Sequence, residues 1–383
     1  MSLHFTDTEL AARRERACAS MRAAGLDGLL MFRQESMFYL TGYDTFGYCF
    51  FQCMYLGADG RLILLTRAPD FRQAQFTSVV EDIRVWVDLP DAGPAEQVRD
   101  IAEECGHRGG RLGIEWDAYG LTAANGRKVD AAFQGFCTLE DASDLVSELR
   151  IIKSATEIDL VRKAAALTDD AYDAAAALTS PGADEGEILA AMQGAVFKGG
   201  GDYPGNEFII GSGDGALMCR YYSGRRVMDA QDQLTLEWAG AYGHYHAAMM
   251  RTFVVGDVPA RQQHLFDACH DALLAVEADV VPGKTFGDAF EAHARTIDAA
   301  GLAEHRLNAC GYSLGTTFAP TWMDWAMMYR GNSRVFEPGM VIFCHMIIFD
   351  SDAGLAMTLG ETVLVTETGN ERLSRSPLDL VVR

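Results

Sequence analysis

The sequence is short of basic residues and has no long apolar run. Of its 383 residues, 32 are Lys or Arg and 54 are Asp or Glu, which gives a formal net charge of −22. Such a negative field repels nucleic-acid phosphates and anionic membrane surfaces, so neither is an expected partner. No apolar run reaches the roughly 18 residues of a membrane span. The N-terminus is charged where a signal peptide needs an apolar core, so we expect a cytoplasmic protein.

Several catalytic motifs are also missing. The chain has no Walker A loop, no dinucleotide-binding glycine fingerprint, no HExxH pair and no GxSxG elbow. Nucleotide-dependent and serine-hydrolase chemistry therefore have no support. The nine cysteines are odd in number and scattered among apolar neighbours, which predicts free thiols. Cys49 and Cys53 have no second pair and no nearby histidine, which argues against a zinc site there.

The sequence does have a hydrophobic fraction of 49% and a length typical of two domains. A helix is predicted over residues 8–24, followed by short apolar runs that alternate with helical segments such as 95–105. This alternation predicts an α/β domain over residues 1–154. Its expected strands cover residues 29–32, 49–56, 62–66, 85–87 and 112–116.

A second domain is predicted over residues 155–383. Ser154 and Glu157 form a capping-box pattern at the start of a long amphipathic helix. Two Pro-Gly turns, at Pro181 and Pro282, each precede a further amphipathic helix and then β-rich runs. This pattern favours two related α+β halves around a shared core, with chance similarity of two short turns as the alternative.

Three polar residues interrupt apolar strands of this second domain. Burial of Glu237 would raise its pKa and suit it to general-base or nucleophilic work, unless an arginine such as Arg220 keeps it ionised. A structural salt bridge is the alternative. His345 lies in the apolar run VIFCHMIIF and needs a buried partner, for which Glu361 is a candidate. His246 is either catalytic or a hydrogen-bonded core histidine.

Two segments have the composition of a binding site. Residues 220–226 place three arginines beside tyrosines in an acidic protein, which suits a carboxylate, with a solvated surface turn as the alternative. Residues 318–329 are rich in Trp, Met and Tyr and contain the single acid Asp324. They suit a pocket for a small cationic or polar ligand, with a core-packing loop as the alternative.

Seven segments in order resemble the creatinase/prolidase/methionine-aminopeptidase (M24) superfamily. The resemblance covers nearly the whole chain and implies a creatinase-type N-terminal α/β domain followed by a pita-bread domain with pseudo-twofold α+β halves. The segments are SELRIIKSATEIDLVRKAA, IIGSGDGALMCRYYSGRR, LEWAGAYGHYHAAMMRTFVVG, VPGKTFGD, GYSLG, EPGMVIFCHM and TLGETVLVTETG.

The resemblance also implies that the metal site of this superfamily is lost. Its metallopeptidases hold two metal ions with two Asp, one His and two Glu. A Glu, a Tyr, a His and an offset Glu361 do not reproduce such a site, so we expect no catalytic metal and no cofactor. The corresponding positions of this chain are Glu237, Ala248, Tyr312, His345 and Gly360.

The chain looks most similar to metal-free creatinases and, more closely, to ectoine hydrolases, which cleave C–N bonds of small zwitterionic, amidine-like molecules. The resemblance implies that Glu237 is the nucleophile or general base and that His345 and His246 carry protons. Glu361 would orient one histidine or bind a cationic group. The substrate-binding residues that it implies are Arg220, Tyr312, Trp322, Asp324 and Tyr39.

The chain also departs from these relatives. The catalytic His of creatinase aligns with Arg220, its Glu before the Arg-Thr pair aligns with Met250, and the acidic residue of ectoine hydrolases after Pro is Thr321. Creatine and ectoine are therefore not assigned as substrates. Residues 38–43 resemble the segment by which one subunit of this fold caps its partner's site, which implies a homodimer.

Three other functions stay open. A metal-dependent Xaa-Pro dipeptidase or aminopeptidase would lose activity with a chelator and regain it with manganese or cobalt. A non-catalytic binding protein on a degenerate scaffold would bind partners without Glu237. A lyase could hold a small sulfonium or betaine in an aromatic cage of Trp322, Trp325 and Tyr329.

Overall fold

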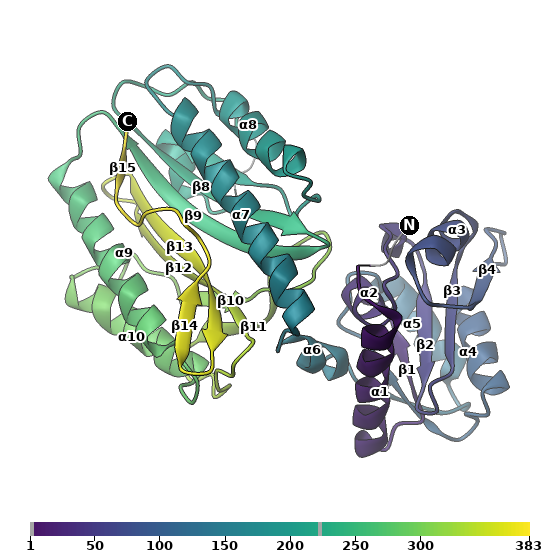
Figure 1. Ribbon diagram of the computed structural model, residues 1–383. Helices are drawn as coiled ribbons and strands as arrows, with labels where there is room; N and C mark the ends of the chain where they lie inside the picture. The colour runs from purple at the N-terminus through teal and green to yellow at the C-terminus, as the bar shows by residue number, and fades with distance from the viewer. Residues whose placement is uncertain (1–3, 221–223) are drawn as a thin grey trace. The chain divides into compact units, whose positions relative to one another are not determined.

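The computed structural model describes residues 4–220 and 224–383 (Figure 1). The chain divides into two compact units, Met1–Arg150 and Ile151–Arg383. All nine cysteines are free thiols, as predicted. Among the described residues, none of the helices has the length and apolar character needed to cross a membrane.

The first unit is a six-stranded sheet with helices on both faces, in the strand order β4-β3-β2-β1-β5-β6. Alternate residues of β1 enter different cores: Leu29 packs with α1 and α2, whereas Leu30 packs with α4 and α5. Both faces are buried, which explains why the strands appear in the sequence as continuous apolar runs. The predicted α/β organisation is confirmed, except that Cys49 belongs to a short 3-10 helix and not to β2. The elements are α1 (Asp7–Ala24), β1 (Gly28–Met31), α2 (Gln34–Thr41), η1 (Gly47–Cys49), β2 (Cys53–Gly57), β3 (Leu62–Arg67), α3 (Ala68–Thr77), β4 (Asp82–Trp86), α4 (Pro94–Glu104), β5 (Arg111–Ile114), α5 (Ala123–Phe133), β6 (Thr138–Asp141) and α6 (Leu145–Arg150).

The second unit is a nine-stranded sheet whose main path runs β11-β10-β12-β13-β9-β8-β7, with β14 beside β13 and β15 beside β9. Tyr172 of α7 stacks on Trp238 of β8, and α9 and α10 share a core with Met346 and Leu359 of β12 and β13. These contacts put α7, α9 and α10 on one face of the sheet (Figure 1). The elements are α7 (Ala155–Leu178), α8 (Glu185–Lys198), β7 (Ile209–Ser212), η2 (Gly213–Leu217), β8 (Asp232–Tyr242), β9 (Tyr245–Val255), α9 (Ala260–Asp279), α10 (Phe286–Ala299), β10 (Ala309–Ser313), β11 (Asp324–Tyr329), β12 (Val341–Asp350), β13 (Leu355–Thr366), β14 (Gly369–Arg372) and β15 (Val381–Val382).

The capping box predicted at Ser154 and Glu157 is present at the start of α7. The two Pro-Gly turns also have equivalent surroundings. Gly182 and Gly283 both have left-handed backbones, at φ 82° and φ 87°. After each turn the N-cap residue of the next helix forms an isolated antiparallel bridge, which joins Asp184 to Val227 and Thr285 to Val335. Matching backbone contacts at both turns support the related α+β halves that the sequence predicts.

Candidate active site

Residues on four adjacent strands form a row across the second sheet. Glu237 of β8 pairs with Met250 of β9, Met250 pairs with Gly360 of β13, and Gly360 pairs with His345 of β12. Directly paired residues point to the same face of a sheet. Glu237 and His345 therefore share the face opposite α7, α9 and α10.

Tyr312 of β10 reaches the same carboxylate from further along the sheet. Its hydroxyl donates a hydrogen bond to Glu237 Oε1 at 3.4 Å and accepts one from Trp322 Nε1 at 2.9 Å. Strands β10 and β8 are four places apart, which in a flat sheet would separate them by about 19 Å. The contact forms because the sheet curves, so residues from its two halves meet on the hollow side. The predicted binding residues Tyr312 and Trp322 therefore adjoin the predicted base.

The environment of Glu237 poises it for proton transfer at neutral pH. Burial raises the pKa of its carboxyl group to about 7. The nearby positive charge of Arg220 and the hydrogen bond from Tyr312 oppose this rise by favouring the carboxylate. A general base works best when its pKa lies near the working pH.

His345 lies next to Tyr312, on the same face of the sheet, as a buried neutral imidazole. Its ring centroid is 5.5 Å from that of Tyr312 and 5.6 Å from that of Phe343. Burial is the main cause that lowers the pKa of His345 to about 3, and electrostatic interactions with His293 and Arg220 lower it further. Its Nδ1 atom is buried and has no hydrogen-bond partner within the described chain. A buried polar atom of this kind marks a place for a ligand or water.

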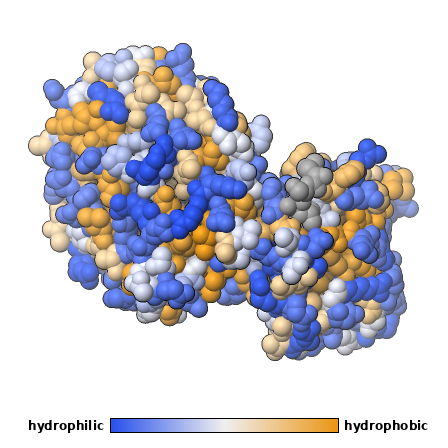
Figure 2. All heavy atoms as spheres, in the orientation of Figure 1, coloured by the Kyte–Doolittle hydropathy of each residue, from blue (hydrophilic) through white to orange (hydrophobic). Residues whose placement is uncertain are grey.

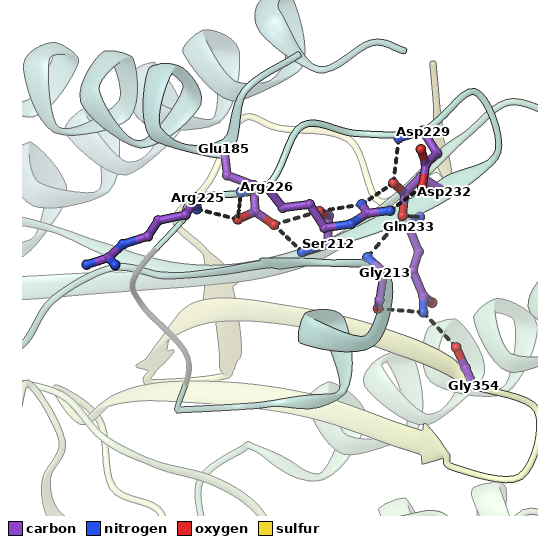
Figure 3. Close-up of polar contacts among 9 residues, drawn as sticks. All are labelled: Glu185, Ser212, Gly213, Arg225, Arg226, Asp229, Asp232, Gln233 and Gly354. Atoms are coloured by element: carbon purple, nitrogen blue, oxygen red, sulfur yellow. Dashed lines mark hydrogen bonds and ion pairs between the residues drawn. The ribbon is translucent and has the colours of Figure 1, made fainter. Parts of the chain in front are cut away.

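Arg220 approaches the site from an exposed position after η2, and a polar network anchors the chain around it (Figure 3). The carboxylate of Glu185 accepts hydrogen bonds from the backbone N–H and the hydroxyl of Ser212, both at 2.6 Å. Its other oxygen accepts from the backbone N–H groups of Arg225 and Arg226, at 2.9 and 3.1 Å. Ser212 and Arg225, which lie on either side of Arg220 in the sequence, are thus held by the same carboxylate.

The three arginines of this segment do not form one patch. Arg226 pairs with Asp229 and Asp232, and the side chain of Arg225 points away from this network in Figure 3. Of these three arginines, Arg220 is the one that acts electrostatically on Glu237. The tyrosines at 221 and 222 of the predicted patch lie outside the described residues.

His246, a predicted proton carrier, lies in the core next to the site. Its side chain is completely buried. Nε2 accepts a hydrogen bond from the Gly205 backbone at 2.9 Å, and Nδ1 lies 3.2 Å from the hydroxyl of Thr317. Burial lowers the pKa of His246 to about 4. Both ring nitrogens therefore have protein partners.

The prediction that Glu361 is the partner of His345 is wrong. Glu361 pairs with Cys344 in the sheet register, which turns its side chain to the helix-covered face. There it forms a buried ion pair with Arg251. A displacement of one residue along a strand reverses the face, which is why the sequence order alone was misleading.

Two other predicted binding residues are buried among protein partners. Tyr39 belongs to the core of the first unit, where its buried hydroxyl donates to the Leu149 carbonyl at 2.9 Å, so it is not open to a ligand in this structure. Asp324 is buried at the start of β11. A Cβ added to Gly315 would lie 2.8 Å from Asp324 Oδ2 and 3.5 Å from Lys153 Nζ, so these two opposite charges flank that glycine.

The side chains present do not fit the two metal ions of the related metallopeptidases. The ring of Phe343 fills the space beside Gly360, since a Cβ there would lie 2.7 Å from its Cζ. Ala248 offers no ligand atom beyond its backbone. Across residues 4–220 and 224–383, no three His, Cys, Asp or Glu side chains are grouped so that they could hold a metal ion.

Two supporting residues were not predicted from the sequence. Glu185 looks like an ordinary acidic residue in the first turn of a helix, yet it is buried and anchors the Arg220 segment. Asn206 accepts a hydrogen bond from the Trp322 backbone at 3.1 Å through its side chain. The only sequence signal was its place in the glycine-rich loop GGGDYPGNE.

Comparisons with known proteins agree with this architecture. The chain is 27% identical to ectoine hydrolase from Halomonas elongata, over 100% of this chain and 99% of that protein. It is 25% identical to the Xaa-Pro dipeptidase from Pyrococcus furiosus, over 62% of this chain and 67% of that one. The solved structure of an Xaa-Pro dipeptidase from Bacillus anthracis covers 98% of this chain, and 100% of that chain is matched, with a TM-score of 0.84 and 22% identity.

The family models fit both units. The creatinase/prolidase N-terminal domain matches residues 13–152, and metallopeptidase family M24 matches residues 159–367. The predicted resemblance and the two-domain creatinase-type fold are thereby confirmed. By its sequence and its fold, the chain belongs to metallopeptidase family M24.

Proposed function

We propose that the protein is a metal-independent hydrolase that cleaves a C–N bond of a small zwitterionic amidine, guanidino or amide compound. The similarity to an ectoine hydrolase over the full chain supports a hydrolase of C–N bonds. The observation that carries the proposal is Glu237, a carboxylate whose pKa of about 7 suits a general base and which Tyr312 holds by a hydrogen bond.

In the proposed reaction, Glu237 removes a proton from a water molecule as the water oxygen attacks the carbon of the C–N bond. The new C–O bond forms, the C–N bond breaks, and the proton passes from Glu237 to the departing nitrogen. The Tyr312 hydroxyl keeps the carboxylate in place throughout. The unpartnered Nδ1 of His345 provides a hydrogen-bonding site for a polar group of the substrate.

The surrounding charges and rings suit a zwitterion. Arg220 supplies the positive charge for a substrate carboxylate. Tyr312 and Phe343, whose ring centroids are 5.4 Å apart, supply aromatic surface for a delocalised cationic group. Pairing one charge with Arg220 and the other with Glu237 and the rings would orient the reacting carbon at the carboxylate.

An Xaa-Pro dipeptidase is the second candidate, because relatives with that name match this chain in sequence and in fold. This candidate needs a metal site. Two observations argue against such a site. Phe343 fills the space beside Gly360, and the methyl side chain of Ala248 has no atom that could bind a metal.

The test is turnover of a mixed pool by chelator-treated enzyme, read by mass spectrometry. The pool contains ectoine, creatine, N-acyl diamino acids and an Xaa-Pro dipeptide. We expect a small zwitterion to be consumed without added metal. Cleavage of the dipeptide alone, and only after manganese or cobalt is added, would show that the protein is a metallopeptidase.

A further inference from the structure

The hydrogen bonds of His246 define its tautomer. The backbone N–H of Gly205 donates to Nε2 at 2.9 Å, so Nε2 carries no proton. The proton of the neutral ring is therefore on Nδ1, which lies 3.2 Å from Thr317 Oγ1 and 3.4 Å from the Gly315 carbonyl. The backbone N–H of His246 also donates to that carbonyl at 3.2 Å. One imidazole thus joins the loop before β7 to the loop after β10.

The loop at Gly205 in turn touches the loop that carries Trp322. A Cβ added to Gly205 would lie 2.5 Å from the Thr321 carbonyl oxygen, so the two backbones are in direct contact. The side-chain oxygen of Asn206 accepts from the Trp322 backbone N–H at 3.1 Å. A displacement of Gly205 would therefore displace Trp322.

The last two contacts of this chain end at the reacting carboxylate. Trp322 Nε1 donates to the Tyr312 hydroxyl at 2.9 Å, and that hydroxyl donates to Glu237 Oε1. Trp322 is nearly fully buried, so it has little room to compensate for movement of its backbone.

We propose that His246 is a positioning residue, whose neutral ring fixes Gly205 and Asn206 against Trp322 and thereby holds the Tyr312 hydroxyl on Glu237. A proton carrier needs a nitrogen that reaches the substrate. His246 is fully buried and has protein partners at both nitrogens, so it does not offer one. The effect on turnover rests on the proposed function, whereas the contact with Gly205 does not.

Two substitutions separate the two sides of the ring. In His246→Gln the side-chain oxygen can reach the place of Nε2 and accept from Gly205. In His246→Asn the side-chain amide can reach the place of Nδ1 and donate toward Thr317 and Gly315, but it is too short to reach Gly205. The two variants have amide side chains of the same chemistry, so each controls for the loss of the imidazole.

The first measurement is hydrogen–deuterium exchange of peptides that contain residues 201–207, which needs no substrate. We expect slow exchange at Gly205 in the wild type and in His246→Gln, and faster exchange in His246→Asn. In turnover assays we expect His246→Gln to keep most of the wild-type kcat and His246→Asn to lose about 10²-fold. His246→Asn should also shift the acidic limb of the pH profile to higher pH. The weakened hydrogen bond from Tyr312 would stabilise the Glu237 carboxylate less and so raise its pKa.

Two results would overturn the proposal. Equal loss of turnover in both variants, with unchanged exchange, would identify His246 as a proton carrier. Unchanged turnover and unchanged exchange in both variants would show that the hydrogen bond between His246 and Gly205 does not position Trp322 and Tyr312. Should either variant fail to fold, the partly buried Asn206 gives a second pair: Asn206→Asp keeps the acceptor for Trp322 and should keep turnover, whereas Asn206→Ala should lose it. Equal turnover of that pair would contradict the proposal.

Discussion

At the scale of single residues, burial deprives the negative charge of Glu237 of solvation by water and raises its pKa. We predict that Glu237→Gln lowers turnover by about 10²–10⁴-fold, the usual contribution of a general base. The same change should raise the free energy of unfolding at pH 8 by about 1 kcal/mol, after allowance for the partial exposure of the group, because a neutral amide replaces a desolvated charge. Turnover assays and urea unfolding measure the two effects.

Glu207→Gln is the matched control, since Glu207 is an exposed residue of the same chemistry. It should leave both quantities unchanged. A Glu237→Gln variant that keeps its turnover would remove Glu237 from the reaction. One that is less stable than the wild type at pH 8 would mean that the carboxylate is a structural ion-pair partner.

The hydrogen bond from Tyr312 lowers the pKa of Glu237, so removal of the Tyr312 hydroxyl should change the pH dependence of kcat/KM. The wild-type kcat/KM should fall on the acid side with a midpoint near pH 7, the pKa of Glu237. Tyr312→Phe removes the donor that stabilises the carboxylate and should raise that midpoint by about one pH unit. Tyr203→Phe, at an exposed tyrosine, should not move it. An unchanged midpoint in Tyr312→Phe would show that the hydrogen bond does not act on Glu237.

Residue identity predicted part of this site. A carboxylate or an imidazole inside an apolar strand is unusual enough to mark Glu237 and His345 from the sequence alone. The partner of His345 could not be predicted in the same way, because strand parity decides which face Glu361 occupies. Tyr39 looked like a binding residue by resemblance, but burial inside its own unit depends on three-dimensional packing.

At the scale of elements, the chain between η2 and β8 depends on the first turn of α8. Glu185→Gln would place an amide N–H₂ group against backbone donors and should cost about 3 kcal/mol of folding free energy. We predict that it also raises KM about tenfold with little change in kcat, because the role that we propose for Arg220 is to bind the substrate carboxylate and not to take part in bond breaking. Steady-state kinetics and urea unfolding measure both effects.

Glu187→Gln, two residues further along α8 and exposed, is the matched control and should behave like the wild type. A Glu185→Gln variant with lower kcat and unchanged KM would show that the segment acts on the chemical step and not on binding.

The elements themselves were largely predictable, for local reasons. The capping box at Ser154 and the two Pro-Gly turns are short-range signals that need no tertiary information. The curvature of the second sheet is not local. The contact between Tyr312 and Glu237 depends on residues from both halves of a curved sheet, and no spacing in the sequence encodes it.

At the scale of the whole molecule, buried neutral histidines make stability depend on pH. Burial lowers the pKa of His246 and His293 to about 4 and that of His345 to about 3. Their folded-state pKa values lie below the unfolded value of roughly 6.5, so the unfolded chain binds more protons in between. Stability is therefore lost as the pH falls below about 6.5. Between pH 7 and pH 5 each of these histidines lowers the free energy of unfolding by about 2 kcal/mol. Protonation of Glu237, whose pKa is raised in the folded state, offsets part of this loss.

His293 offers a clean test because it lies outside the proposed catalytic set. In His293→Leu, the loss of unfolding free energy between pH 7 and pH 5 should be smaller than in the wild type by about 2 kcal/mol. Urea unfolding at the two pH values measures it, with a substitution of the more exposed His270 by Leu as control. An unchanged difference would mean that His293 binds protons equally in the folded and unfolded states, so that burial does not lower its pKa.

The outer surface is mostly hydrophilic on the face in Figure 2, with hydrophobic areas among the polar ones. In the first unit, exposed apolar side chains include Phe46 at 77% exposure and Phe76 at 59%. Hydrogen bonds from Asp44 and Thr45 to residues of α3 hold these two segments together. Large apolar side chains that are exposed on two adjoining segments suit a protein–protein interface.

We therefore propose that the protein is a homodimer whose interface buries Phe46 and Phe76. Light scattering after gel filtration should give twice the chain mass of 41.8 kDa. Phe46→Asp with Phe76→Asp should yield monomers, whereas Tyr119→Asp, at another exposed aromatic residue of that unit, should not. A monomeric wild type would refute the dimer, and a dimeric double variant would refute this interface.

We propose that this member of a metallopeptidase family hydrolyses its substrate without a metal. The most direct measurement is kcat/KM on the hydrolysed zwitterion before and after exhaustive chelation, with residual metal quantified by mass spectrometry. We expect the same value of kcat/KM in both states, with metal far below one equivalent per chain. A loss of activity on chelation that manganese or cobalt restores would contradict it.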